Sequence, residues 1–454
     1  MNNISQAEQA DIKSHRLSDQ QIEDNFTDLH PPLSASEASI EADRCYFCYD
    51  APCTTACPTA IDIPGFIQAI RSDNLKGAAF KIFEENILGG MCARVCPTEV
   101  LCQQDCVRNT HEDKPVEIGL LQRYATDAVL ADNVQFFKAA AKTGKSVAIV
   151  GAGPAGLSCA HRLASQGYEV SIFEARDKPA GLNEYGIAAY KSTDEFAQRE
   201  VDYVLAIGGI TIQTEMALGE DITLKWLREE YDAVFLACGL AAVNKLGLTD
   251  ENAEGVIDAV QYISDLRQAS NKADLPVAKN VVVIGGGMTA IDIAIQTKLL
   301  GAEQVTIAYR RGKAQMAASE YEQKLAQTKG VQIRYNASPR NLIRNNGHVS
   351  GIEFDLMSQQ ADNILYASGD SFTLPADVVF KAIGQKLVSQ NLTDTQAVKL
   401  DKGRIIVDEF RRTSVDGVWA GGDCVLDGQN LTVSAVQDGK LAANSINQFL
   451  TAKG

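Results

Sequence analysis

Cysteine is concentrated in one short stretch of this chain, which limits how that stretch can fold. Eight of the eleven cysteines lie between residues 45 and 106. The first four follow the pattern Cys45-x2-Cys48-x4-Cys53-x3-Cys57 with a proline next, and the others are Cys92, Cys96, Cys102 and Cys106. This spacing is typical of thiolates that surround an iron–sulfur cube, and there are enough of them for about two four-ligand clusters. The pattern therefore indicates an electron-carrying segment.

Two other roles for these cysteines are open. A disulfide framework suits small secreted domains, whereas a chain of 454 residues with 45% apolar content can bury a core of its own. Structural zinc is the stronger rival, because Cys-x2-Cys and Cys-x3-Cys pairs also suit a tetrahedral ion. Zinc pairs are usually separated, however, while Cys45 to Cys57 crowd four thiols together. The crowding favours iron and sulfide.

The bulk composition excludes several functional classes. The length predicts about two to four domains. A formal charge of -16 with no basic run argues against a nucleic-acid surface. The first 24 residues lack the apolar core of a signal peptide, and no apolar run approaches the length of a membrane span. We therefore expect a cytoplasmic protein, in a compartment that keeps thiolates reduced.

The cysteine-rich segment is predicted to be helical. A polar arm or short helix ends near Pro31-Pro32. Apolar residues then recur at helical spacing from Phe66 to Phe83, and Gly77 and Gly89-Gly90 are expected to interrupt the helices. An amphipathic stretch from Ile118 to Leu130 closes the segment. Residues 1–143 are thus expected to form a small helical domain.

The next segment has the signature of a dinucleotide-binding unit. A predicted strand at residues 146–150 runs directly into Gly151, Gly153 and Gly156 and then into a helix, which is the context that makes a Gly-x-Gly-x-x-Gly match specific. Such glycines permit a tight turn, close approach of a pyrophosphate, and close packing of helix on strand. The following strand ends at Glu174, where a carboxylate accepts hydrogen bonds from ribose hydroxyls.

The pattern occurs a second time. A strand at residues 280–284 precedes a turn with alanine in the third glycine's place, formed by Gly285, Gly286, Gly287, Met288, Thr289 and Ala290. After the next strand, at 304–309, Arg310 and Arg311 stand where an acidic residue would bind a ribose 2'-hydroxyl. Paired arginines favour a 2'-phosphate and hence NADPH, although two solvated side chains are the alternative.

Towards the C-terminus, Gly422-Asp423 ends a predicted strand and is followed by a helix from Thr432. Here the chain resembles flavoprotein pyridine-nucleotide reductases, in which such an Asp binds the flavin's ribityl and phosphate oxygens and the nicotinamide domain splits the FAD domain. The resemblance implies an α/β fold with a small all-helical iron–sulfur domain followed by two Rossmann-like domains. We expect FAD binding by residues 144–262 and 376–454, joined through strands at 233–239 and 378–384, and NAD(P)H binding by residues 263–375.

With its N-terminal cysteines, the chain is similar to the flavin and iron–sulfur half of dihydropyrimidine dehydrogenase, which is a separate small subunit in bacteria, and more distantly to the small subunit of glutamate synthase. The stretches that carry this are residues 44–59, 95–98 and Ile118-Gly119-x2-Gln122. The resemblance implies two [4Fe-4S] clusters with Cys92 as a spare thiol. One would be held by Cys45, Cys48, Cys53 and Cys106, the other by Cys57, Cys96, Cys102 and Gln122. Gln122 on a solvated helix face is the alternative.

The same resemblance implies flavin contacts along the chain. They fall on Gly151, Gly153, Pro154, Ala155, Gly156, Leu157, Glu174, Gly181, Leu182, Lys191, Ala382, Ile383, Gly384, Gly422, Asp423, Asn430, Leu431 and Thr432. Lys191 stands where the family has Arg, and Met288 and Ala317 replace an acidic and a basic residue of its coenzyme site. These departures affect the preference for NADPH.

The resemblance implies an oxidoreductase subunit of pyrimidine catabolism that oxidises NAD(P)H at FAD and passes electrons through the clusters. The partner would be an FMN- and iron–sulfur-containing subunit that reduces uracil and thymine, because this chain shows no segment for that chemistry. Another acceptor complex such as glutamate synthase, and a self-contained flavin reductase, are the alternatives. A disulfide reductase needs a thiol pair, yet Cys159, Cys238 and Cys424 are each alone in sequence. The sequence identifies no acid or base catalyst, and Cys238 is expected to be a small packing residue.

Overall fold

The computed structural model describes residues 17–359, 365–392 and 398–452. They form two compact units. The larger unit contains residues 29–184, 191–242 and 386–452, and the smaller contains 17–28, 185–190 and 243–385. The opening of the chain up to residue 16, part of the expected N-terminal arm, lies outside the described residues.

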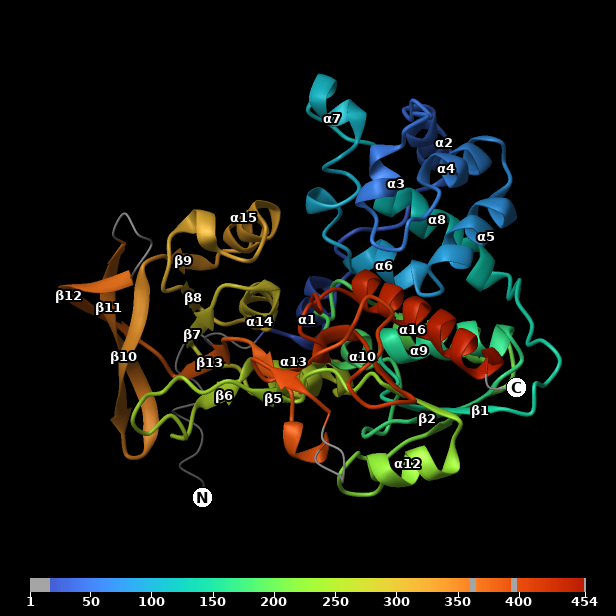
Figure 1. Ribbon diagram of the computed structural model, residues 1–454. Helices are drawn as coiled ribbons and strands as arrows, with labels where there is room; N and C mark the ends of the chain where they lie inside the picture. Colours follow the sequence, from blue (N-terminus) through green and yellow to red (C-terminus); the bar gives the residue numbers. More distant parts are fainter. Residues whose placement is uncertain (1–16, 360–364, 393–397, 453–454) are drawn as a thin grey trace, which may run out of the picture. The chain divides into compact units, whose positions relative to one another are not determined.

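The larger unit begins with a layer of short helices (Figure 1). They are α2 (Ala35–Asp43), α3 (Pro52–Ala56), α4 (Ile63–Arg71), α5 (Leu75–Glu85), α6 (Gly89–Val95), η1 (Thr98–Val100), α7 (Val107–Glu112) and α8 (Ile118–Ala131). Local polar residues set several of their starts: Ser34 and Glu37 form a reciprocal capping box on α2, and Asp62 caps α4. The expected helical domain is therefore present.

The break between α4 and α5 differs from the expectation. Gly77, expected to interrupt the helix, lies in the first turn of α5, where its N–H donates to the side chain of Asn74 at 2.9 Å. The helix starts at the residue that can cap it, since a side-chain acceptor satisfies an otherwise unpaired N–H group. The apolar residues Phe66, Ile67 and Phe83 are buried as their spacing predicts, each contributing about 2 kcal/mol of burial free energy.

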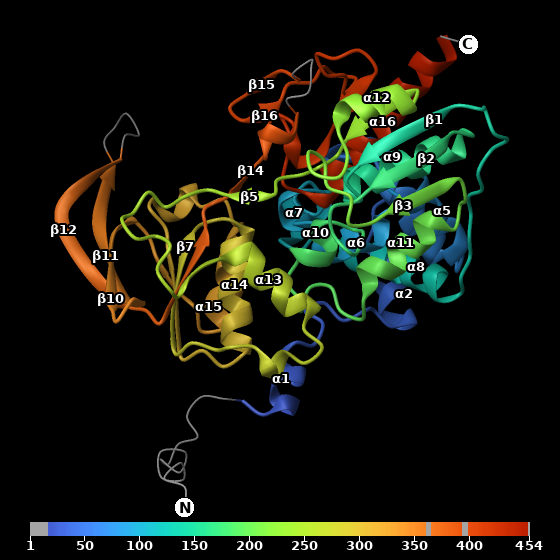
Figure 2. The ribbon, with the colours of Figure 1, turned by 90° about the horizontal axis from the view of Figure 1, so that it is seen from below.

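A five-stranded parallel sheet follows in the same unit (Figure 2). Its order is β17 (Val418–Ala420), β4 (Ala233–Leu236), β1 (Ser146–Val150), β2 (Glu169–Phe173) and β3 (Ile210–Gln213). Helices α9 (Pro154–Ser165) and α16 (Thr432–Ala452) pack on each other beside it. The C-terminal strand β17 thus joins the sheet of β1, which fits a domain interrupted in sequence.

The remaining elements of this unit are short. They are α10 (Leu182–Tyr185), whose last residue is assigned to the smaller unit, α11 (Phe196–Leu205), α12 (Leu224–Glu230), η4 (Ser389–Leu392), β15 (Leu400–Asp401), β16 (Arg404–Ile405) and η5 (Gly422–Cys424). The chain passes from one unit to the other at β5 (Ala242–Val243) and β14 (Gln385–Lys386).

The smaller unit contains a second parallel sheet. Its order is β6 (Val256–Asp258), β13 (Val378–Ala382), β7 (Asn280–Gly285), β8 (Gln304–Ala308) and β9 (Gln332–Arg334). An antiparallel sheet of β10 (Ala337–Asn345), β11 (His348–Gln359) and β12 (Leu365–Pro375) adjoins it. The helices are α1 (Asp19–Asn25), α13 (Ala259–Gln268), η2 (Lys272–Asp274), α14 (Met288–Leu299), η3 (Lys313–Gln315) and α15 (Glu320–Thr328).

The extent of this unit differs from that of the expected coenzyme domain. Residues 263–375 were expected to form it, with Val378–Ala382 as a strand of the other domain. Instead β13 pairs with β7 along its whole length, from Val378 opposite Val281 to Ala382 opposite Gly285, and β6 pairs with β13. The backbone of β7, which pairs with β8 on one side, needs a partner on its second side, and β13 supplies it. The unit therefore extends from residue 243 to 385.

Candidate functional site

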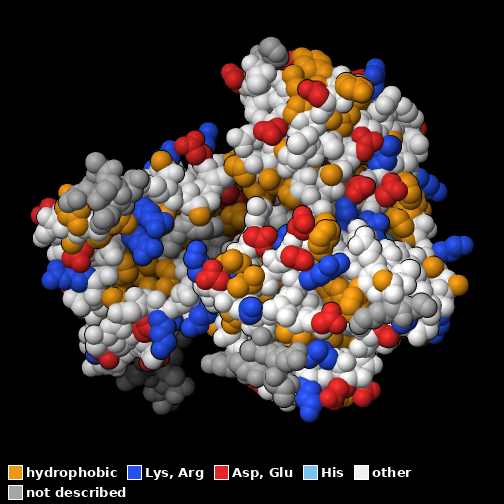
Figure 3. Space-filling model, in the orientation of Figure 1, with side chains coloured by type: hydrophobic (Ala, Val, Ile, Leu, Met, Phe, Trp, Pro, Cys, Tyr) orange, Lys and Arg blue, Asp and Glu red, His pale blue; other side chains and the backbone are white. Residues whose placement is uncertain are grey.

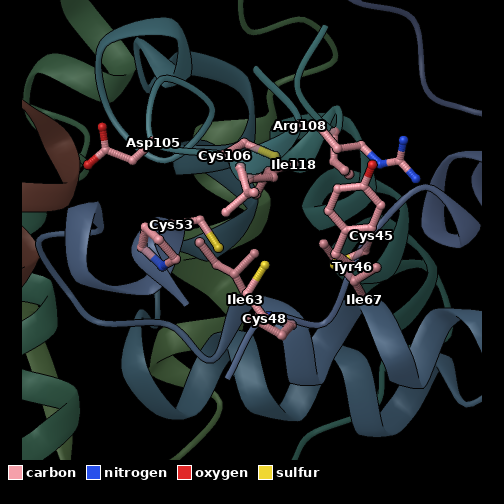
Figure 4. A pocket seen from close by; sticks show the side chains of 14 residues that line it. Cys45, Tyr46, Cys48, Cys53, Ile63, Ile67, Asp105, Cys106, Arg108 and Ile118 are labelled. Atoms are coloured by element: carbon pink, nitrogen blue, oxygen red, sulfur yellow. The ribbon is translucent and has the colours of Figure 1, made fainter. Parts of the chain in front are cut away.

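A first group of thiols lines one pocket in the helical layer of the larger unit. Cys45 and Cys48 lie in the loop after α2, Cys53 lies in α3, and Cys106 caps α7. Figure 4 shows Cys48, Cys53 and Cys106 pointing into this pocket, whose wall includes the apolar side chains of Ile63 and Ile67. We call Cys45, Cys48, Cys53 and Cys106 the first thiol group.

Burial favours the uncharged form of two of these thiols, Cys53 and Cys45. Loss of solvent raises the pKa of Cys53 to about 12, and the neighbouring thiols of Cys45 and Cys106 raise it further. Burial likewise raises the pKa of Cys45, against a smaller opposing effect of the Phe47 backbone N–H. Thiolates crowded in an apolar site need a strongly positive centre to be stable. The donor set therefore fits an iron–sulfur core.

A second group of thiols lies beside the first. A hydrogen bond with Cys92 is the main cause that raises the pKa of Cys96, followed by burial and by the charges of Cys102 and Cys57. Burial, and then Cys57 and Cys53, raise the pKa of Cys102. We call Cys57, Cys96 and Cys102 the second thiol group. Within the described residues, no three His, Cys, Asp or Glu side chains converge on a point where one metal ion would bind.

Gln122 is a buried residue of α8, with 7% of its surface exposed, and does not lie on a solvated face. Its side-chain N–H donates to the carbonyl of Gly89 at 2.7 Å, at the start of α6, the helix that leads to Cys96. This bond assigns the amide nitrogen to the protein and leaves the amide oxygen as the atom suited to a metal. Its expected role as a cluster ligand stays a prediction.

The first glycine turn lies between β1 and α9, and its glycines allow neighbouring backbone segments to approach one another closely. A Cβ on Gly151, whose φ is +100°, would lie 2.4 Å from the carbonyl oxygen of Ala237, and one on Gly156 would lie 2.0 Å from that of Gly151. Helix α9 begins after Gly153 without a side-chain cap. Its first N–H groups are therefore directed to whatever occupies the turn, and their positive end suits a phosphate.

Other expected flavin residues gather around this turn. Gly181 approaches Gly153 so closely that a Cβ on it would lie 2.9 Å from the Gly153 Cα. A Cβ on Gly422 would lie 3.2 Å from that of Ala155, and Thr432 donates to the side chain of Asn183 at 2.8 Å. The fold thus brings together segments 151–157, 181–183, 422–423 and 430–432.

Glu174 ends β2 as expected and is buried. Its carboxylate accepts hydrogen bonds from the N–H groups of Ala152 at 2.8 Å and Arg176 at 3.0 Å. These bonds hold the carboxylate at the edge of the glycine turn, where a ribose hydroxyl would meet it.

Sequence reasoning missed the charged residues that support Asp423. Burial raises the pKa of Asp423 to about 6, while the charge of Arg404 lowers it. Arg404 also donates to the Asp423 backbone carbonyl at 2.5 Å. Behind it, Asp438 of α16 accepts from the N–H of Gly422 at 2.8 Å and pairs with Arg411 at 2.6 Å. No local motif indicates these partners, because Arg404 lies in β16, Arg411 lies in the loop after it, and Asp438 lies in the distant helix α16.

The second glycine turn, between β7 and α14 in the smaller unit, repeats this design. A Cβ on Gly285 would lie 2.1 Å from the carbonyl oxygen of Ala382, whereas Gly287 has nothing within 4 Å of that position. The ring of Tyr309, a residue the sequence analysis did not select, covers Gly286, since a Cβ there would lie 2.5 Å from it. Gly287 precedes α14 without a side-chain cap.

The remaining expected residues are placed as follows. Met288 and Thr289 begin α14, and Ala290 is buried in its first turn. Arg310 and Arg311 follow β8 and are exposed. Ala382, Ile383 and Gly384 follow one another at the end of β13, and Lys191 precedes α11. Contacts of these residues with a coenzyme stay predictions.

Two glycine turns, each joining a parallel strand to a helix, and a helical layer with grouped thiols define a two-nucleotide flavoprotein reductase with an iron–sulfur domain. Comparison with family models agrees. The chain belongs to the pyridine nucleotide-disulphide oxidoreductase family, whose model matches residues 145–439. Residues 22–134 match the model for dihydropyrimidine dehydrogenase domain II, 4Fe-4S cluster. The expected fold class and the expected oxidoreductase activity are confirmed.

Relatives over almost the whole chain confirm the resemblance seen in the sequence. The chain is 35% identical to the NAD-dependent dihydropyrimidine dehydrogenase subunit PreT of Salmonella typhimurium, over 94% of this chain and 98% of the relative. It is 33% identical to the glutamate synthase [NADPH] small chain of Escherichia coli, over 94% of each. The family matches imply FAD and a 4Fe-4S cluster.

Solved structures agree with the fold. The thioredoxin reductase of T. acidophilum is 25% identical with a TM-score of 0.54, and the match covers 68% of this chain and 99% of that chain. FprA of Mycobacterium tuberculosis in complex with NADPH is 18% identical with a TM-score of 0.58, covering 68% and 85%. In the described part of the chain, helices are too short or too polar to cross a membrane.

Proposed function

We propose that this chain is the electron-input subunit of a larger reductase, which oxidises NAD(P)H at FAD and delivers electrons through two [4Fe-4S] clusters to a partner subunit. The observation that carries the proposal is that two groups of partly buried thiols and the first glycine turn belong to one compact unit. Bound FAD supplies a centre that exchanges both a hydride and single electrons, and bound clusters supply one-electron carriers.

The thiol groups support two clusters. The first thiol group would hold one cluster. The second would hold the other, with the oxygen of Gln122 as its fourth ligand, and Cys92 would be the spare thiol beside Cys96. An oxygen ligand changes the charge of a cluster and thereby its potential. The protein's part is to bury the thiols and to hold each donor atom in place.

The groups around each turn support the other two cofactors. FAD would lie on segment 151–157 with Glu174 at its ribose and Asp423 at its ribityl chain. NAD(P)H would lie on the turn from Gly285 to Ala290. The exposed Arg310 and Arg311 make no ion pair with any described residue, which leaves both available for a 2'-phosphate. This supports NADPH, whereas the pyrimidine-type relatives are named NAD-dependent.

The partner we propose is an FMN- and iron–sulfur-containing subunit that reduces uracil or thymine. Two relatives of this chain are named as subunits of an NAD-dependent dihydropyrimidine dehydrogenase, which supports a partner of this kind. Exposed apolar side chains also flank the cysteine segments, including Tyr46, Tyr49 and Val100, which are 51%, 106% and 47% exposed. Figure 3 shows apolar side chains gathered on the helical layer at the top of the view. Apolar and aromatic surface of this kind suits a protein interface.

Purification under anaerobic conditions tests the proposal. The chain alone should contain FAD and about eight iron and eight sulfide ions, and should reduce artificial dyes with NAD(P)H while leaving uracil unchanged. Uracil or thymine reduction should appear only when the FMN-containing partner is added. Zinc in place of iron and sulfide would refute the cluster assignment. Electron delivery to a glutamate-forming partner instead would support the glutamate synthase alternative, and substrate reduction by the chain alone would support a self-contained reductase.

The coenzyme is tested separately. Arg310→Ala should raise the KM for NADPH by about tenfold, as expected for loss of a charge-assisted hydrogen bond of about 1.4 kcal/mol. The KM for NADH should change little. Arg340→Ala, an exposed substitution on β10, is the matched control. An equal change in the KM for NADPH and the KM for NADH in Arg310→Ala would show that Arg310 does not bind a 2'-phosphate.

A further inference from the structure

The fold brings together two cysteines that the sequence treats as unrelated. Strands β4 and β17 run side by side in parallel, with Leu236 opposite Ala420. Cys238 lies two residues beyond Leu236, and Cys424 lies four residues beyond Ala420, in η5. The Cys424 sulfur contacts the Leu236 carbonyl at 3.6 Å and the Gly421 carbonyl at 3.2 Å. Two cysteines that are each alone in sequence therefore lie on neighbouring segments at the same edge of the sheet.

The two thiols act on each other in opposite directions. A hydrogen bond from Cys424 is the main cause that lowers the pKa of Cys238, and burial opposes it. The same bond, followed by burial, raises the pKa of Cys424. Cys424 keeps its proton. The acceptors available to that proton are the Cys238 sulfur and the carbonyl oxygens of Leu236 and Gly421. Cys238 is partly exposed, while Cys424 is buried. Cys238 is thus suited to attack a disulfide, and Cys424 is suited to attack the mixed disulfide that results.

This pair adjoins the first glycine turn. A Cβ on Gly151 would lie 3.3 Å from the Cα of Cys238. Cys424 directly follows Asp423, and the N–H of Gly422 in the same short helix is held by Asp438. A covalent bond between the two sulfurs would replace the contacts of Cys424 with the backbone carbonyls and draw η5 towards β4.

We propose that Cys238 and Cys424 are a reversible dithiol–disulfide site that responds to small disulfides. The Cys238 thiolate attacks one sulfur of the oxidant, forming a mixed disulfide and releasing one thiolate. Cys424 then gives up its proton and attacks the Cys238 sulfur, releasing the second thiol and closing the Cys238–Cys424 bond. The pair loses two electrons and two protons, and one external disulfide becomes two thiols. Excess thiol reverses both steps.

Closure of the bond would change the flavin cradle. Because η5 carries Asp423, we expect the disulfide form to hold FAD less firmly than the dithiol form. This consequence rests on the proposed function, whereas formation of the bond does not.

The test uses the full-length holoprotein under anaerobic conditions. It is incubated with 2-hydroxyethyl disulfide, its free thiols are alkylated after denaturation, and peptides are analysed without reduction. The expected product is a Cys238–Cys424 cross-linked peptide that has lost two hydrogen atoms and disappears on treatment with dithiothreitol. Cys424→Ala should stop the reaction at a mixed disulfide on Cys238, while Cys238→Ala should leave Cys424 unmodified. Cys159→Ala removes another buried cysteine and should leave the cross-link unchanged.

Two outcomes would overturn the proposal. One is recovery of both cysteines as alkylated thiols from the oxidised wild-type chain. The other is modification of Cys238 no faster than that of Cys159. Cys424→Ser, a smaller change, separates a folding defect from loss of the resolving thiol. Flavin release is measured in parallel: a cross-link without FAD loss limits the site to thiol chemistry, whereas missing FAD or clusters in the untreated protein would count against the proposed function alone.

Discussion

A buried carboxylate at the meeting point of the helical layer and the flavin-type sheet domain makes the stability of the larger unit depend on pH. Glu200 of α11 is 2% exposed and accepts a hydrogen bond from the Met91 N–H of α6 at 3.0 Å. Burial raises its pKa to about 8. The Met91 N–H and the charge of Arg94 lower it by smaller amounts, and the charge of Asp127 raises it. At neutral pH the carboxyl is therefore mainly protonated.

The sign and size of the effect follow from proton binding. Between a pKa of 4.5 in the unfolded chain and about 8 in the folded chain, the folded state holds one proton more than the unfolded state. The free energy of unfolding then falls by about 1.4 kcal/mol per pH unit. The contribution is fully present below about pH 4.5 and is lost as the pH rises through about 8. From about pH 6 to about pH 9 the loss is about 2.7 kcal/mol.

Glu200→Gln keeps the acceptor for Met91 but cannot ionise, so it should remove this dependence. The difference in melting temperature between wild type and Glu200→Gln, measured at one scan rate, should move by roughly 5 °C in favour of the variant between about pH 6 and about pH 9. Glu195→Gln, at the exposed start of the same helix, is the control. A difference that stays constant over this range would refute the reasoning.

Further substitutions test the packing and the ligand assignments. Gly156→Ala places a Cβ 2.0 Å from a backbone carbonyl and should abolish FAD retention, measured as the flavin-to-protein absorbance ratio; a normal ratio would contradict the role of this turn. Cys96→Ser should remove about half of the bound iron, whereas Cys92→Ser should leave the iron content unchanged, and the reverse result would exchange ligand and spare thiol. Gly90→Ala directs a Cβ to 2.6 Å from the Phe196 ring and should destabilise the protein by about 1–3 kcal/mol, a loss that Phe196→Leu should partly restore in the double variant if the clash is the cause.

Strands, helices and turns that depend on residues close together in the sequence could be predicted from the sequence. The strand at 146–150, the helix that begins near Ile118 and both glycine turns lie where the sequence analysis expected them. Each depends on residues within a few positions of one another: alternation of apolar side chains, a capping residue, or a glycine that a turn requires. Family membership followed from these patterns and from the cysteine spacing.

Features that join distant parts of the chain could not be predicted in this way. The extent of the smaller unit depends on β13, whose partner β7 lies almost a hundred residues earlier in the chain. Glu200 meets Met91 across more than a hundred residues, and Cys238 meets Cys424 across a still longer separation. The sequence pattern of one segment in such a pair carries no information about its contact with the other segment.

The amino-acid sequence by itself therefore determined which chemistry this protein carries: clustered thiols, two phosphate-binding turns and an acidic strand end. Only the tertiary structure decided that Gln122 is buried against α6, that the Glu200 carboxyl is buried between the helical layer and the sheet of the larger unit, and that the segments of Cys238 and Cys424 lie on neighbouring strands. The reason is physical. Local conformation follows from short-range sterics and hydrogen bonds, whereas burial and the pKa values that depend on it arise when strands and helices far apart in sequence pack together.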